Sequence, residues 1–142
     1  MDRFFSLEPE VAGGWGDRTV ADTAVHPPVV SHLHYEFHGW LGDELVESFP
    51  CYLVTEALGA TISQAGLSGC SLDRAEVTCS QEFTALQPDT KLPAFKWLRI
   101  SGVAGQSDLG LSLEHVLVIS EQALQVIGTH GISNCAVAEW RR

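Results

Sequence analysis

Hydrophobic and polar positions alternate with a period of two between residues 29 and 41, VVSHLHYEFHGWL. The stretch is rich in β-branched and aromatic residues, which is typical of a β-strand. One face carries Leu33, Tyr35, Phe37 and Gly39, and the other carries His32, His34, Glu36, His38 and Trp40. This alternation predicts a half-buried strand, with its apolar side toward the core and its polar side toward solvent.

An internal repeat occupies the later part of the chain. Residues 51–72 (CYLVTEALGATISQAGLSGCSL) align without a gap with residues 116–137 (VLVISEQALQVIGTHGISNCAV), a shift of 65 positions from 51 to 116. The order of hydroxyl, acid, glycine and cysteine matches in the two copies. Each copy predicts a strand, a short helix and a second strand, and we interpret the repeat as a structural duplication.

The two predicted helices carry matching signals at both ends. Thr55 and Ser120 are predicted N-caps, because a hydroxyl can accept a hydrogen bond from an exposed backbone N–H group. Glu56 and Glu121 then fall in the first helical turn, where the helix dipole favours an acid. Gly66 and Gly131 are predicted to end the helices in a left-handed conformation.

The remaining segments complete an α+β prediction. Residues 1–28 contain prolines and closely spaced glycines, including GGWGD, and predict a loop-rich arm wrapped on the domain. Residues 75–80 and 95–100 are further strand candidates. The chain, residues 1–142, is thus predicted to form a single α+β domain with a mixed or antiparallel sheet and two short helices.

Charge is unevenly distributed along the chain. The formal net charge is -10, and no lysine or arginine occurs between Thr19 and Asp73. Such a balance repels a polyanion, so nucleic acid is not expected as a partner. Two readings stay open for the acidic segment: a solubilising surface, or a face that steers a basic partner.

Two further patterns bear on location. No apolar run approaches the roughly 20 residues of a membrane span, and acids interrupt the first ten residues, MDRFFSLEPE. We therefore expect a cytoplasmic protein that is neither exported nor bound to a membrane.

Candidate chemistry is sparse. Neither a GxSxG motif nor a phosphate-binding loop is present, and the cysteines at 51, 70, 79 and 135 lack CxxC spacing. Three nearby acids, Asp43, Glu44 and Glu47, favour a solvated edge over an acid–base pair. We expect no enzyme activity and no cofactor. The alternative is a small metal-binding protein or enzyme that uses His32, His34 and His38.

An aromatic residue beside acids instead favours a protein interface. Trp40 lies on the polar face of its predicted strand, next to the turn at Gly42 and Asp43. Aromatic residues anchor interfaces, and charges set the association rate and the choice of partner. The predicted partner-binding residues are Trp15, Asp17, Glu36, Trp40, Asp43, Glu44 and Glu47. The oligomeric state stays open.

Several segments resemble immunity proteins of bacterial polymorphic toxin systems. They are EPEVAGGWGD, HPPVVSHLHYEFHGWLGDELVESFPCYLVTEAL, LPAFKWLRISG and VLVISEQALQVI. The resemblance spans most of the chain and is closest to members with a strand followed by an SE-x-A-L helix. It implies a small cytosolic protein that binds a cognate toxin domain and blocks it, and it supplies no catalytic residue. Many such toxins are nucleases, whose basic clefts an acidic protein can fill.

Overall fold

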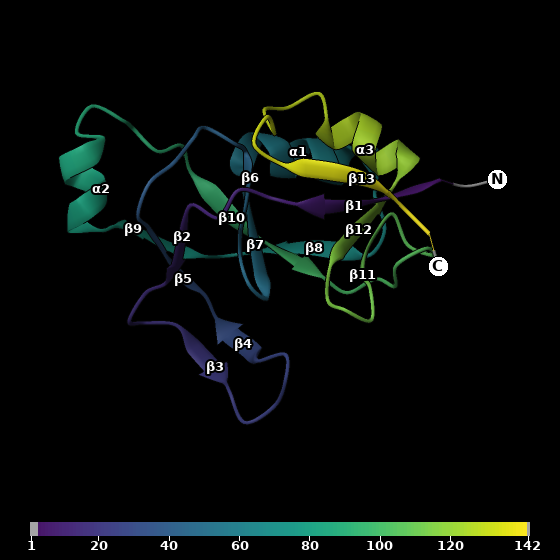
Figure 1. The fold of residues 1–142 in the computed structure, drawn as a ribbon, viewed down its shortest axis with the longest axis horizontal. Helices are drawn as coiled ribbons and strands as arrows, with labels where there is room; N and C mark the ends of the chain where they lie inside the picture. The colour runs from purple at the N-terminus through teal and green to yellow at the C-terminus, as the bar shows by residue number, and fades with distance from the viewer. Residues whose placement is uncertain (1–2, 142) are drawn as a thin grey trace.

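The computed structural model describes residues 3–141, which form an α+β fold with three sheets, a hairpin and three short helices (Figure 1). The first sheet has the order β11 (Leu109–Leu111), β12 (Leu117–Ser120), β1 (Phe4–Glu8), β13 (Ala136–Trp140). The second has the order β6 (Leu45–Ser48), β7 (Cys51–Thr55), β10 (Phe95–Ile100), β8 (Cys70–Asp73). The third has the order β2 (Gly13–Trp15), β5 (His34–Phe37), β9 (Glu76–Cys79). The hairpin pairs β3 (Val20–Asp22) with β4 (Val29–His32). The helices are α1 (Glu56–Ala65), α2 (Gln81–Leu86) and α3 (Glu121–Ile127).

The first and second sheets confirm the predicted duplication. Each contains a hairpin, then a helix, then an edge strand, and the strand orders match position by position. The shift of 65 positions also preserves the register. In the second sheet, Leu98 of β10 pairs with Tyr52 and Leu72. In the first sheet, Leu7 of β1 pairs with Leu117 and Val137, which lie 65 positions after Tyr52 and Leu72. The N-terminal strand β1 therefore takes the central position in the second copy that β10 takes in the first.

The predicted helix starts are confirmed. The Thr55 hydroxyl accepts a hydrogen bond from Leu58 N at 3.1 Å, and the Ser120 hydroxyl accepts one from Ala123 N at 3.0 Å. An acid follows each cap in the first turn. These bonds satisfy donors that a helix N-terminus leaves free.

The predicted helix ends are confirmed in only one copy. Gly66 caps α1 with φ 66°, a left-handed conformation that glycine adopts at little cost. The prediction for Gly131 is wrong, because α3 already ends at Ile127 and is capped by Gly128 in a right-handed conformation. Gly131 instead lies in the loop after α3, where its carbonyl accepts a hydrogen bond from Glu44 N.

The main core lies between the duplicated units. Helices α1 and α3 pack against each other and lie side by side in Figure 1. The core contains matching residues from the two units, such as Val54 with Ile119 and Ile62 with Ile127, all nearly inaccessible to solvent. Because each unit buries its apolar face against the other, the two copies form one core.

A second core lies on the opposite face of the second sheet. Cys51, Leu53 and Trp97 project there, and the third sheet covers them with Tyr35 and Phe37. Coverage on both faces explains why every residue of β7 is buried. Helix α2, which the sequence did not predict, closes this layer with the buried ring of Phe83 and is capped by Ser80.

The N-terminal region differs from the predicted loop-rich arm because it contributes β1, β2 and β3. Gly13 and Gly14 belong to strand β2 and do not form a turn. At Gly13 a Cβ atom would lie 1.9 Å from the Glu36 carbonyl oxygen, so the close approach of β2 to β5 requires glycine.

The predicted strand over residues 29–41 is divided into β4 and β5, with a break at Leu33. The prediction that its polar face meets solvent is wrong for His34, which is 4% exposed. The segment after β2 crosses over this histidine, and a Cβ atom on Gly16 would lie 2.1 Å from the imidazole ring. Within residues 3–141, no helix has the length and apolar character needed to cross a membrane.

Candidate partner-binding groove

A surface groove of about 700 Å³ lies between the segment that follows β1 and the segment that follows β5. Its lining residues are Pro9, Glu10, Val11, Ala12, Gly13, His38, Gly39, Trp40, Leu41, Gln87 and Asn134. Val11 is 69% exposed and Leu41 is 72% exposed, so two large apolar side chains project beside the groove. We refer to this feature as the Trp40 groove.

Trp40 is held in a fixed position in this groove. Its indole N–H donates to the Asp43 carbonyl oxygen at 2.9 Å, and its ring meets the buried ring of Phe95 edge-on. Gln87 accepts from Trp40 N at 2.7 Å and donates to Trp40 O at 3.0 Å. A half-buried, hydrogen-bonded tryptophan of this kind loses little conformational entropy when a partner covers it.

Glu10 fixes the other side of the groove. This acid is 7% exposed, and its carboxylate accepts hydrogen bonds from Leu41 N at 2.7 Å and Asp43 N at 3.3 Å. The carboxylate therefore anchors the turn that presents Leu41 to solvent. Among the lining residues that the structure describes, none is a lysine or an arginine.

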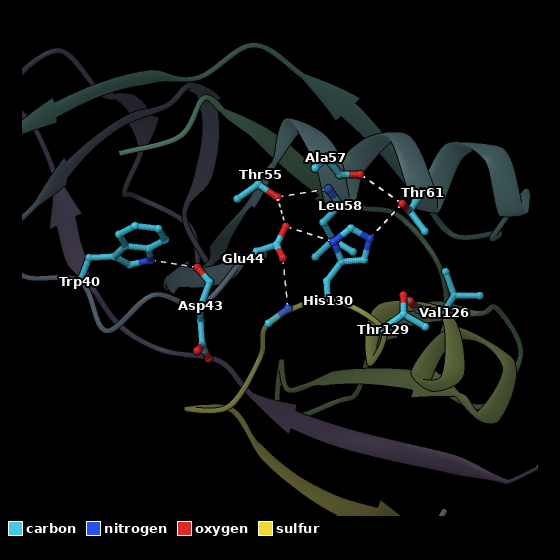
Figure 2. A network of polar contacts seen from close by, with 11 residues as sticks. Trp40, Asp43, Glu44, Thr55, Ala57, Leu58, Thr61, Val126, Thr129 and His130 are labelled. Atoms are coloured by element: carbon cyan, nitrogen blue, oxygen red, sulfur yellow. Dashed lines mark hydrogen bonds and ion pairs between the residues drawn. The ribbon is translucent and has the colours of Figure 1, made fainter. Parts of the chain in front are cut away.

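Asp43 and Glu44 attach the loop after α3 to this turn, and Figure 2 shows the contact between Glu44 and His130 of that loop. The Asp43 carboxylate accepts hydrogen bonds from Asn134 N and Asn134 Nδ2, both at 2.9 Å. The Glu44 carboxylate accepts one from Gly131 N at 3.1 Å and contacts His130 Nδ1 at 3.0 Å. Since Asn134 lines the groove, these two acids position one of its walls.

Glu44 also links the loop to the start of α1. Its carboxylate accepts a hydrogen bond from the Thr55 hydroxyl at 2.6 Å, and His130 Nε2 contacts the Thr61 hydroxyl at 2.9 Å. Burial by itself raises the pKa of Glu44, but the hydrogen bonds from Thr55, Gly131 and His130 outweigh it and lower the pKa overall. The carboxylate is thus ionised at neutral pH.

The duplicated unit contains a corresponding contact. The Ser120 hydroxyl donates to the Asp108 carboxylate at 2.8 Å, and that carboxylate accepts from Ser68 N at 2.9 Å. Glu44 thus binds the N-cap of α1 and the loop after α3. Asp108 binds the N-cap of α3 and the loop after α1 in the same way. The expectation that Asp43 and Glu44 form a solvated edge is therefore wrong, because Asp43 is 2% exposed and both carboxylates are bonded within the fold.

A different pair of acids is available near the groove. Glu8 directly precedes the groove residue Pro9, and Glu47 N donates to the Glu10 carbonyl oxygen at 2.9 Å. Burial raises the pKa of Glu47, and the negative charge of Glu8 raises it further. Within residues 3–141, neither carboxylate has a hydrogen-bond or ion-pair partner.

The other predicted partner-binding residues lie at different places. Trp15 is half-buried against the second core, and Asp17 is exposed in the turn after β2. Glu36 lies on β5, 3.5 Å from the exposed ring of His38. Of the predicted residues, only Trp40 lines the groove, with Asp43 and Glu44 behind it.

The three histidines of the alternative metal-binding prediction have separate partners. His34 Nδ1 accepts from Arg18 N at 3.1 Å, and its Nε2 contacts the Thr78 hydroxyl at 2.7 Å. His32 contacts Glu76 at 2.9 Å, and His38 faces Glu36. Among residues 3–141, no three histidine, cysteine or acidic side chains are placed to hold a metal ion. His32, His34 and His38 therefore do not converge on one point of the described structure.

Cys51 does not have the character of a nucleophile. It is 4% exposed, and burial raises the pKa of its thiol to about 12, against a small opposing effect from Arg99. A thiol of this kind remains protonated at neutral pH and packs as a core residue.

The sequence did not indicate Val11, Leu41 or Asn134 as site residues. Val11 precedes the glycines of the predicted arm, and Asn134 lies in the second repeat unit, so no local pattern connects them with Trp40.

Neither models of known protein families nor curated proteins gave a match to this chain.

Proposed function

We propose that this chain is an immunity-type protein that binds a cognate toxin domain and inhibits it. The Trp40 groove carries this proposal, because a fixed tryptophan with two strongly exposed apolar side chains beside it has the character of an interface anchor. The formal net charge of -10 adds electrostatic attraction for a basic toxin. The compartment proposed for this interaction is the cytoplasm.

Growth protection tests this function. If the reading frame next to the gene encodes a large secreted protein, its C-terminal domain is the candidate toxin and is expressed in a host bacterium, alone and together with this chain. We expect the toxin domain to stop growth and the chain to restore it through a stable complex. Absence of protection and of a complex would contradict the proposed function.

A further inference from the structure

Several acids away from the Trp40 groove are paired with cations, whereas within residues 3–141 Glu8 and Glu47 have no such partner. Asp73 accepts a hydrogen bond from Arg99 at 3.0 Å, and Glu76 pairs with Arg18. Arg3 lies 3.6 Å from Glu121 and 3.5 Å from Glu139. These three arginines are engaged with acids, and none of them lines the groove.

Glu8 and Glu47 lie next to the segment that forms one side of the groove, because Glu8 precedes the lining residue Pro9 and Glu47 N donates to the Glu10 carbonyl oxygen at 2.9 Å. The negative charge of Glu8 raises the pKa of Glu47, as expected for carboxylates that repel each other. A cation that approached from outside would relieve this repulsion. Within residues 3–141, no lysine or arginine of the groove lining would compete with it.

We propose that the Trp40 groove receives a segment of the partner in which a lysine or arginine lies close to a large apolar side chain. The apolar side chain packs on Val11 and Leu41 beside Trp40, and the cation is bound by Glu8 and Glu47. This inference rests on the proposed function and specifies the chemistry of the partner.

The charge of the chain selects among possible occupants. A second copy would bring another net charge of -10 to an acidic surface. A nucleic acid would be repelled in the same way. A basic segment of another protein is the occupant that complements both the acids and the apolar surface.

Photo-crosslinking in the cells that encode the chain tests this inference. Leu41→p-benzoylphenylalanine places the crosslinker beside the groove, and Leu113→p-benzoylphenylalanine is the matched control, because Leu113 is 95% exposed and is not a lining residue. We expect crosslinks to a toxin domain only from position 41, in a partner peptide that contains lysine or arginine next to the crosslinked residue.

A charge variant provides a second measurement. The double variant Glu8→Gln/Glu47→Gln removes two charges beside the groove, and Glu114→Gln/Glu56→Gln removes two exposed charges elsewhere. We expect the crosslink yield to fall about tenfold in the first variant and to change little in the second. Circular dichroism melting curves identify any variant that has lost its fold.

The outcomes separate this inference from the proposed function. If position 41 crosslinks to a toxin domain through a peptide without a cation, or if both charge variants behave alike, the inference is wrong and the function stands. If position 41 crosslinks to no toxin domain, or no more than position 113, the function itself is contradicted.

Discussion

At the scale of single residues, a few hydroxyls and carboxylates hold together parts of the chain that are far apart in the sequence: Asp43 binds Asn134, and Glu44 binds both Thr55 and Gly131. The caps Thr55 and Ser120 could be predicted because the bonds that define them reach only three residues along the chain. The burial of Asp43 and Glu44 could not, because the backbone donors they bind are 91 and 87 positions away in Asn134 and Gly131. An acid next to a glycine turn looks solvated in a sequence, whatever the fold later places against it.

Glu44→Gln should destabilise the protein at neutral pH. The neutral amide replaces a carboxylate that accepts from Thr55 and Gly131, and it lowers the free energy of unfolding by about 1–3 kcal/mol. Urea unfolding measures this, with Glu56→Gln as the control, because Glu56 is exposed and forms only a 4.0 Å ion pair.

The same variant should show a defined pH dependence. Because the folded state lowers the pKa of Glu44, this stabilisation is complete above the unfolded-state pKa and is lost as the pH falls through the folded-state pKa. The difference in unfolding free energy between wild type and Glu44→Gln should therefore shrink in acid. A difference that grew on acidification would contradict the assignment.

At the scale of elements, the repeat predicted both strand–helix–strand units, but it did not predict how their sheets are completed. The order of apolar, capping and glycine positions within residues 51–72 and 116–137 identifies the strands and the helix of each unit. The central strand of the second unit is β1, more than a hundred residues earlier, and pairing over such a separation leaves no periodic signal. The prolines and glycines that follow β1 favoured a loop interpretation for the whole region.

Removing one cap hydroxyl should affect more than its own helix. Ser120→Ala loses the bond from Ala123 N and the bond to Asp108, which also binds Ser68 of the other unit. We expect a loss of about 1–2 kcal/mol in the free energy of unfolding, with an unchanged dependence on denaturant. Ser63→Ala, at an exposed position of α1, is the control, and an equal effect in both variants would contradict the linked role of Ser120.

At the scale of the whole molecule, the duplicated units and the third sheet create the Trp40 groove together. One wall comes from the turn after β5, another from the segment after β1, and Asn134 comes from the loop after α3. The charge pattern predicted an acidic, aromatic surface, but it could not separate acids that bind the fold from acids that remain unpaired. The folded structure makes this distinction, because Asp43 and Glu44 are bonded internally and Glu8 and Glu47 are not.

The most direct test of partner binding at the groove compares two exposed leucines. Leu41→Asn and Leu113→Asn make the same neutral change at positions that are 72% and 95% exposed, and only the first lies in the groove. Isothermal titration calorimetry with the toxin domain should show about tenfold weaker binding for Leu41→Asn and unchanged binding for Leu113→Asn. Equal affinities for wild type and Leu41→Asn would contradict the account.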